Sequence, residues 1–453
     1  MTTRRLPPRL RSTAPLLLLL GFALLPRGAA QQPPQEPQPP AAGQPPGSQS
    51  PDEVTLELRR GQRPLIKLAI PAFRGGERLA GPAAAAARDL EASGYFAIQG
   101  PADFRVLQTT GDPARDAAQY RSLGNEILLA GDVRGEGDRI VFEGRLWDLQ
   151  SGQAILAKRY RGSYPVARRI GHTFADEVIR YLTGGRGIGL TSLAFTSDRT
   201  GHKEIWVMDY DGNGQRRLTG HKSTSMSPAW EASGAGLAYT SFFSGPPGIY
   251  YVDLATGRKR GIVTSGSLNI TPSFSPDGGR VAFAASLGGN IEIFTADRNG
   301  GGRRRLTQSN AIDTTPAWSP KGGDIVFTSS RAGNPHLYLM GADGSDQRRL
   351  TFDGDYNDGA AWGPEGDRIA YTSRRGGRFQ IAVLDLVTLE SRLLTSGPGE
   401  NESPTFSPDG RKIAFTSRRT GRKQVYVMDS ATGGNVHQLT REGNNDMAEW
   451  SRK

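Results

Sequence analysis

The C-terminal part of the chain carries one hydrophobic motif six times. Leu193-Ala-Phe-Thr-Ser recurs with conservative changes at starts 237, 281, 325, 369 and 413, always 44 residues apart. Trp or Phe stands at 230, 274, 318, 362, 406 and 450, which keeps the same step. Each repeat holds four short apolar, β-branched or aromatic runs bounded by Gly, Pro, Asp and Asn, so it predicts four strands. Four strands in a repeat of this length are typical of a β-propeller blade.

The two ends of this region predict how the ring of blades closes. The first repeat begins at its second strand, Leu193, whereas the chain finishes on an inner-strand motif, Met447 to Trp450. We expect this last strand to pair with 193–219, so that both ends of the region build the first blade. Closure removes exposed sheet edges. Residues 193–453 are therefore predicted to form a six-bladed β-propeller with four-stranded blades.

Residues 52–183 lack the 44-residue step. Their hydrophobic residues follow the two-residue period of strands in some segments and the 3.6-residue period of helices in others. Alternation and short apolar runs predict strands, and the spacing of Ile170, Phe174, Val178 and Leu182 predicts a helix. The expected strands are 54–58, 65–70, 127–130, 139–147 and 154–160, and the expected helices are 83–93 and 166–182. The prediction is an α/β N-terminal domain with a mixed sheet, joined to the propeller by a glycine-rich hinge at 184–192.

The first 51 residues predict an export signal and a spacer. Residues 1–30 hold five arginines, no acid and an apolar run of about 12 residues, too short for a bilayer that needs about 20. We interpret 1–30 as a signal peptide and the Pro/Gln-rich 31–51 as a disordered tail. The signal supplies +5 of the net charge of +11, so the remaining charge does not suggest nucleic-acid binding.

Cysteine is absent and histidine occurs five times. Disulfides, thiol catalysis and Cys-ligated metals are thus excluded. His172 and Asp176 lie one helical turn apart, and we interpret them as a structural pair at the domain junction. Arg258 to Arg260 and Arg303 to Arg305 are expected on solvated outer strands.

The candidate binding residues lie in the loops that precede the inner strands. Because strand direction alternates within a blade, these loops surround one mouth of the central canal, and polar loops on a rigid scaffold often bind partners. The predicted set is Asn269, Thr271, Asp313, Thr314, Thr315, Asn357, Asp358, Glu400, Glu402 and Asp446.

The charges of this face predict an acidic centre inside a basic rim, a pattern that would steer a complementary partner. The rim residues are Arg199, Lys203, Arg331, Arg374, Arg375, Arg418, Arg419, Arg422 and Lys423. No cofactor is expected to be required, although Asp355, Asp358 and Glu402 could hold Ca²⁺, which takes six to eight oxygen ligands.

Several motifs in this order resemble the TolB family of the Tol–Pal envelope system. They are Arg63-Pro-Leu-Ile with Ile70-Pro-Ala-Phe, Asp89-Leu with Ser93-Gly-Tyr-Phe, Arg145-Leu-Trp-Asp, Arg169-Ile-Gly-His with Asp176 and Leu182-Thr-Gly, and the repeats with their SPDG turns. The resemblance spans residues 54 to 453. In this chain about twenty Pro/Gln-rich residues precede the segment that begins at Val54.

The resemblance implies a non-catalytic periplasmic scaffold. It implies that Val54, Leu56, Leu58 and Arg60 contact TolA, an inner-membrane protein, and that the canal mouth binds the peptidoglycan-associated lipoprotein Pal. It also implies a role in outer-membrane integrity and in invagination during cell division. The protein would then associate with the membrane only through its partners. Other envelope proteins remain possible as further partners.

Two other classes stay open at this stage. One is an exported propeller enzyme, either a lyase or a glycosidase that uses paired canal carboxylates. The serine-hydrolase motif GxSxG does not occur in the sequence. The other is a glycan-binding module, for which Tyr356 is the only obvious stacking aromatic at the canal mouth.

Overall fold

The computed structural model describes residues 64–75, 79, 81–286, 288–397 and 399–452, and residues 63–453 belong to one compact unit. The predicted signal peptide, the Pro/Gln-rich tail, the 54–58 strand and the TolA-contact residues Val54, Leu56, Leu58 and Arg60 lie outside the described residues.

The N-terminal domain is a five-stranded mixed sheet with helices on both faces. Strand order is β2-β1-β3-β4-β5, with β1 parallel to β2 and β3 and the remaining pairs antiparallel. The strands are β1 (Ile66–Ala69), β2 (Phe96–Gln99), β3 (Ile127–Glu136), β4 (Arg139–Asp148) and β5 (Gln153–Ser163). The helices are α1 (Gly81–Ala92), α2 (Pro113–Ser122) and α3 (Ala167–Thr183), with short 3₁₀ turns at Pro101–Phe104 and Tyr164–Val166.

Alternation along the strands divides the core of this domain in two. Leu68 and Leu129 pack with Leu90 of α1 and Phe174 of α3. Their sequence neighbours Ala69 and Leu128 pack instead with Ala117 and Tyr120 of α2. Because successive strand residues point to opposite faces, α1 and α3 cover one face and α2 the other.

The predicted mixed α/β sheet is confirmed, but sequence reasoning missed β2 and α2. β2 has only four residues, which is too short for a periodic signal. α2 buries only Asp116, Ala117 and Tyr120 and depends on its cap, where the Asp112 side chain accepts the Ala114 N–H at 3.0 Å.

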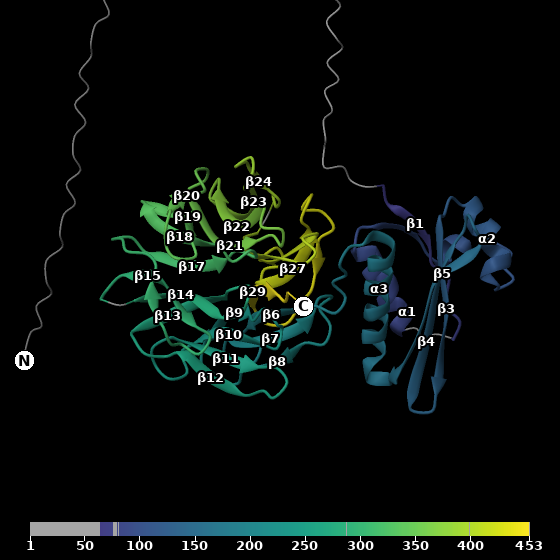
Figure 1. Cartoon of the computed structure of the whole chain (residues 1–453), viewed down its shortest axis with the longest axis horizontal. Coiled ribbons are helices and arrows are strands. Elements are labelled where there is room, and N and C mark those ends of the chain that lie inside the picture. The colour runs from purple at the N-terminus through teal and green to yellow at the C-terminus, as the bar shows by residue number, and fades with distance from the viewer. Residues whose placement is uncertain (1–63, 76–78, 80, 287, 398, 453) are drawn as a thin grey trace, which may run out of the picture. The chain divides into compact units, whose positions relative to one another are not determined.

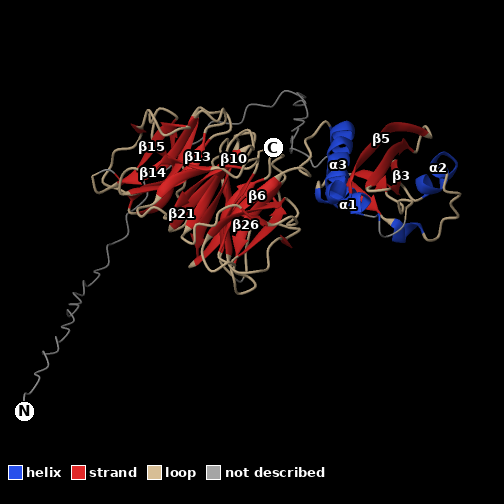
Figure 2. Ribbon diagram, turned by 90° about the horizontal axis from the view of Figure 1, so that it is seen from below, coloured by secondary structure: helices blue, strands red, loops and turns tan. Residues whose placement is uncertain are grey.

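The propeller consists of six four-stranded antiparallel sheets, each with one strand nearest the ring axis, as predicted (Figure 1). All helices of the described residues precede residue 184 (Figure 2). Blades 1 to 3, from inner to outer strand, are β29 (Asn445–Trp450), β6 (Ser192–Ser197), β7 (Glu204–Asp209), β8 (Arg216–Arg217); β9 (Ser225–Trp230), β10 (Gly236–Ser241), β11 (Gly248–Asp253), β12 (Lys259–Val263); and β13 (Leu268–Phe274), β14 (Arg280–Ser286), β15 (Ile291–Asp297), β16 (Arg304–Arg305). Blades 4 to 6 are β17 (Asp313–Trp318), β18 (Asp324–Ala332), β19 (Asn334–Gly341), β20 (Arg348–Arg349); β21 (Tyr356–Trp362), β22 (Arg368–Arg375), β23 (Arg378–Asp385), β24 (Ser391–Leu393); and β25 (Asn401–Phe406), β26 (Lys412–Ser417), β27 (Gln424–Asp429), β28 (His437–Gln438).

The repeated motif explains how neighbouring blades pack. In β10 the side chains of Leu237 and Tyr239 join Trp230 and residues of blade 1, while Ala238 between them joins the blade 3 cluster. Each second strand thus presents large side chains to the preceding blade and a small one to the next. This large-against-small arrangement lets the side chains of neighbouring sheets interdigitate closely.

The outer-strand arginines do more than face solvent. Arg260 donates to the Arg298 carbonyl at 3.1 Å, Arg304 to the Asp343 carbonyl at 2.9 Å and Arg392 to the Ser430 carbonyl at 3.2 Å. Each acceptor belongs to the next blade. The interpretation of 258–260 and 303–305 as solvated faces was therefore incomplete, because one arginine of each triplet connects neighbouring blades.

Ring closure follows the prediction from the chain ends. β29 pairs antiparallel with β6, with Trp450 opposite Leu193 and Asn445 opposite Ser197. The buried Trp450 indole N–H donates to Thr191 Oγ1 at 2.8 Å, and the Ser451 N–H donates to the Ser192 carbonyl at 2.8 Å.

The predicted pairing of His172 with Asp176 is wrong. His172 Nδ1 lies 2.6 Å from Asp89 Oδ2 of α1, and the Tyr210 hydroxyl of the propeller donates to the other Asp89 oxygen. Asp176 Oδ1 accepts the Gly189 N–H at 2.9 Å, and burial raises the pKa of Asp176 to about 6. A Cβ at Gly187 would lie 1.9 Å from Asp176 Oδ1. Close packing therefore requires glycine in this connection.

We predict that Trp450→Ala lowers the free energy of unfolding by about 3–5 kcal/mol, because it empties a buried site at the ring seam. Urea denaturation followed by circular dichroism measures the change. Val106→Ala, an exposed residue of the α/β domain, serves as control. Equal stability of the two variants would contradict the importance of the seam.

Candidate functional site

The inner strands of all six blades enclose a canal of about 660 Å³. Tyr356, Asp358, Phe379, Glu402 and Lys423 line it where inner strands begin. We call this end the mouth. Arg186, Glu449 and Arg452 line it where inner strands end. The wall between consists largely of proline, small residues and the Trp/Phe column.

A ring of left-handed residues shapes the canal wall. One residue of every inner strand has a φ between +46° and +64°, and each lines the canal: Ser227, Thr271, Thr315, Gly359, Ser403 and Met447. The pairing register of each inner strand shifts at this point. Only one of the six is glycine, so the conformation is strained and the fold holds it in place, a feature common at functional sites. Bulges of this kind bend a strand and increase its local twist.

An aromatic pair marks the mouth at blade 5. The rings of Tyr356 and Phe379 lie 5.3 Å apart in an edge-on arrangement. The Arg374 guanidinium lies 6.0 Å and 5.9 Å from their centroids and makes two 3.0 Å hydrogen bonds to Asp355. Burial and then the neighbouring Asp358 raise the pKa of Tyr356 to about 12, so its hydroxyl stays a donor. Tyr and Arg fixed in this way are typical of interface hot spots.

The acids of the mouth all have partners. Asp358 Oδ1 accepts the hydroxyls of Thr315 at 2.8 Å and Thr328 at 2.7 Å. Lys423 Nζ lies 3.0 Å from Glu402 and 3.5 Å from Asp446. The predicted acidic centre is therefore a set of hydrogen-bonded and ion-paired groups, and Lys423 belongs to the mouth and not to an outer rim.

The ten predicted canal-mouth residues divide by location. Those that line the canal are Thr271, Thr315, Asp358 and Glu402. Those buried between blades are Asn269, Asp313 and Asn357, whereas Asp446 is buried beside Lys423 at the mouth. Thr314 and Glu400 are half-buried outside the canal lining, and Glu400 accepts the Phe379 N–H at 2.8 Å.

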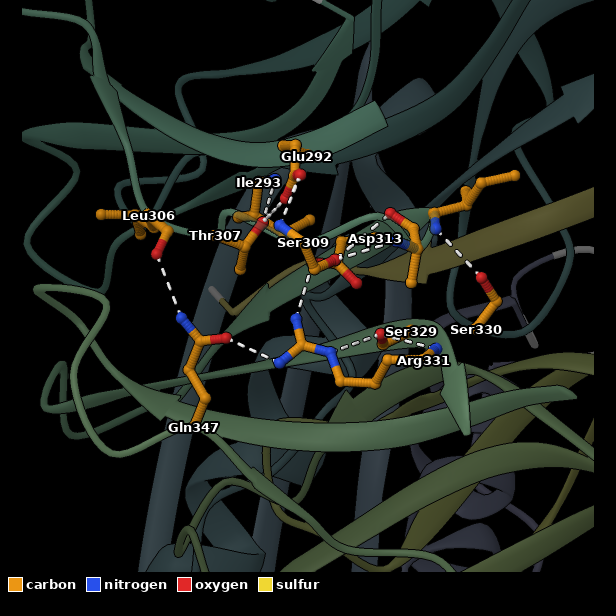
Figure 3. Close-up of polar contacts among 12 residues, drawn as sticks. Glu292, Ile293, Leu306, Thr307, Ser309, Asp313, Ser329, Ser330, Arg331 and Gln347 are labelled. Carbon is orange, nitrogen blue, oxygen red and sulfur yellow. Dashed lines mark hydrogen bonds and ion pairs between the residues drawn. The ribbon is translucent and has the colours of Figure 1, made fainter. Parts of the chain in front are cut away.

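Asp313 shows why the second group is structural, and its expected placement at the canal mouth was wrong. Arg331 donates to Asp313 at 2.8 Å, to Gln347 at 2.8 Å and to Ser329 at 2.9 Å, while Thr307 donates to Glu292 at 2.6 Å (Figure 3). Burial raises the pKa of Asp313, although Arg331 opposes this.

Uncharged side chains at the positions equivalent to Asp313 and Glu292 make hydrogen bonds between other pairs of blades. Asn401 donates to Gln380, and Asn445 donates to Gln424, both at 2.9 Å. This column of side chains therefore fastens one blade to the next.

The residues proposed for Ca²⁺ do not fit the ion. Asp355 is held by Arg374, Asp358 by two hydroxyls and Glu402 by Lys423. Among the residues that the structure describes, no three acidic or histidine side chains converge as a metal site.

Glu449 is a carboxyl that sequence reasoning missed. It lines the canal and accepts the Trp230 backbone N–H at 2.6 Å. Ser273 and Thr405 occupy the same repeat position and accept the N–H of Trp318 and Trp450. Burial raises the pKa of Glu449 to about 8, although the Trp230 N–H and Arg452 oppose this rise. In the aligned repeats the position of Glu449 otherwise holds alanine, serine or threonine. The acid at this position is therefore the sequence feature that would have revealed it.

The fold and the canal define a class of protein, a propeller fused to a small α/β domain with a polar, aromatic-flanked canal mouth. The family description "TolB beta propeller domain" matches residues 179–402, and "TolB amino-terminal domain" matches 54–155. The chain belongs to the TolB family.

Individual relatives agree with this assignment. The chain is 38% identical over 146 residues to the Tol-Pal system protein TolB of Geobacter metallireducens, which covers 32% of this chain and 34% of the relative. It is 35% identical over 179 residues to that of Anaeromyxobacter dehalogenans, covering 38% and 41%. The aligned part thus spans about a third to two fifths of the length of these relatives.

A solved structure extends the likeness to nearly the whole fold. The crystal structure of TolB from Acinetobacter baumannii matches with a TM-score of 0.75 and 28% identity, and the match covers 86% of this chain and 97% of that one. Among the described residues, no helix has the length and apolar character needed to cross a bilayer.

We predict that the free energy of unfolding falls as pH rises from about 4.5 to about 8, in part because of Glu449. Its pKa is raised from 4.5 to about 8 in the folded state. The unfolded chain therefore loses this proton at a lower pH than the folded chain, so deprotonation favours unfolding within that window. Urea denaturation of wild type and Glu449→Gln across this range measures the effect.

The Glu449→Gln variant keeps an acceptor for the Trp230 N–H and should show a flatter pH profile than wild type. Glu442→Gln, at an exposed site in the preceding loop, should keep the wild-type slope. Parallel profiles for wild type and Glu449→Gln would show that Glu449 ionises normally in the folded protein.

Proposed function

We propose that this chain is a non-catalytic, periplasmic component of the Tol–Pal system that binds Pal at its canal mouth and TolA through residues Val54 to Arg60. In this role it supports outer-membrane integrity and invagination during cell division. Membership of the TolB family and the near full-length likeness to a TolB structure support the proposal.

The arrangement of side chains at the canal mouth is the observation that best supports a Pal site there. Tyr356 and Phe379 form a fixed aromatic edge beside the canal, and Glu402 and Lys423 of the neighbouring blade 6 also line it. The loops that hold them are anchored on regular strands, so little side-chain entropy is lost when a partner binds. An aromatic anchor beside paired charges suits recognition of a protein surface.

The same groups suit binding better than proton transfer. A general acid or base needs a titratable group within reach of substrate. At the mouth the Asp358 and Glu402 carboxylates already accept hydroxyl and ammonium donors. Such saturated acids fix geometry, which supports a scaffold over a lyase or glycosidase.

The TolA contact rests on membership of the TolB family, and the sequence of the N-terminal segment is compatible with it. Val54, Leu56 and Leu58 alternate with polar residues, a pattern that suits addition of a strand to a partner sheet. Arg60 adds a positive charge at its end.

We predict that Tyr356→Ala and Glu402→Lys each weaken Pal binding by roughly tenfold or more, as for hot-spot residues. Titration calorimetry with the soluble domain of Pal from the same organism measures the affinity. Val387→Ala is the matched control, because this exposed residue lies in blade 5 on a turn of the opposite face. Unchanged affinity of both mouth variants, with wild-type melting temperatures, would remove the mouth as the Pal site.

We predict that Leu56→Asp combined with Leu58→Asp abolishes capture of TolA and leaves Pal affinity unchanged. The change places charge on the apolar side of the segment. Gln44→Asp with Gln49→Asp adds the same charge within the Pro/Gln-rich tail and should bind TolA normally. Pull-down with the periplasmic part of TolA tests both, and retained capture by the leucine variant would refute the assignment.

A further inference from the structure

The backbone of the canal-mouth face repeats at the inner strands of all six blades, although the loops between second and third strands range from one residue in blade 4 to six in blades 1, 2 and 6. Two sets of loops lie there, those between second and third strands and those before inner strands, because strands alternate in direction. Backbone hydrogen bonds join the two sets, such as Asn445 N–H to the Lys423 carbonyl at 2.8 Å and Phe242 N–H to the Thr224 carbonyl at 3.0 Å. A partner that reads the inner-strand backbone alone would find six similar orientations.

One half of this face is basic. Exposed cations gather on the loops of blades 5, 6 and 1, and none of them forms an ion pair with another described residue: Lys203, Arg378, Arg418, Arg422 and Arg441. In contrast, Arg374 and Lys423 are neutralised by Asp355 and Glu402. Glu442 and Asp198 offset two of these charges, because Glu442 adjoins Arg441 in the chain and Asp198 interacts electrostatically with Lys203. The exposed cations that remain without an acidic partner are Arg378, Arg418 and Arg422.

The other half, over blades 2 to 4, exposes apolar side chains. Phe242 is 39% exposed, Phe243 49%, Ile312 51% and Phe352 71%. Phe243 is held in place, because its ring stacks on His221 at 4.5 Å and meets Tyr250 edge-on at 5.5 Å. The loop 241–247 that presents it carries no charge. Large apolar groups fixed at a surface mark a binding area.

We propose that this division fixes the rotational orientation of Pal on the propeller. The inference rests on the proposed function and adds the chemistry of the partner surface. An acidic patch of Pal lies over blades 5, 6 and 1, and an adjoining apolar patch lies over blades 2 to 4. The other five rotations place carboxylates against phenylalanine or leave cations without partners, and such mismatches disfavour wrong arrangements. Charge complementarity also accelerates encounter.

The first test reverses charge at the basic half. Arg378→Glu, Arg418→Glu and Arg422→Glu are combined in the mature chain, and binding to the soluble domain of Pal is measured at low and high salt. The matched control combines Arg216→Glu, Arg258→Glu and Lys259→Glu, which makes the same charge change at exposed, unpaired cations on and next to the outer strands of blades 1 and 2.

We expect the mouth-face triple variant to bind at least tenfold more weakly at low salt and to lose most of the salt dependence seen in wild type. The outer-strand variant should stay within about twofold of wild type at low salt. Equal affinities of the two variants, with wild type binding normally, would overturn this inference and leave the proposed function standing. Failure of wild type to bind Pal would instead refute the proposed function.

The second test reads orientation directly. The chain contains no cysteine, so Arg422→Cys and Phe243→Cys each provide one attachment point for a photo-crosslinker. We expect residue 422 to cross-link to one acidic segment of Pal and residue 243 to a different, apolar segment. The same mixture of segments from both sites would show rotational averaging and overturn the proposal.

An anionic membrane is the rival occupant of the basic half. Wild type is therefore mixed with vesicles of phosphatidylglycerol and phosphatidylcholine in a sedimentation assay. We expect no sedimentation above that with phosphatidylcholine alone. Binding that the mouth-face triple variant loses, with its Pal affinity intact, would assign the arginines to lipid phosphates and refute the proposal.

Discussion

Burial between neighbouring blades is the constraint on which the rest of the structure depends. A single four-stranded sheet with two apolar faces is unstable in water, so each blade needs one neighbour on either side. Large and small side chains of the repeated motif meet at the junctions between blades: Tyr239 of β10 packs with Ala194 of β6, and Ala238 packs with Phe283 of β14. The canal, its strained wall and its mouth exist because six such junctions close on themselves.

The sequence could predict this architecture because the same requirement recurs every 44 residues. The aromatic column and the Leu-Ala-Phe-Thr-Ser motif report burial at every blade, and Trp450 reports where the last strand pairs. β2 and α2 escaped because their positions depend on neighbours distant in sequence: β2 pairs with β1 over four residues, and α2 buries only three side chains. The left-handed bulge escaped because serine, threonine and methionine occupy it as well as glycine.

The candidate site was predicted less completely for a related reason. A polar residue in a loop next to the axis can face the canal, as Asp358 does, or the adjoining blade, as Asn357 does. The two are neighbours in sequence and alternate in direction. The recurrence of Asn at 269, 357, 401 and 445 is a sign of a repeated structural contact, because a binding surface need not repeat. Tyr356 and Phe379 meet only through the pairing of separate strands of blade 5.

The seam between β29 and β6 has a consequence for how the protein is made. During synthesis β29, which completes blade 1, emerges after the strands of the other five blades. Until then the nascent chain has a vacant place beside β6 that a strand of another molecule can occupy. The blade that is begun first is therefore the last to be completed, and the pairing of β29 with β6 gates maturation of the whole ring.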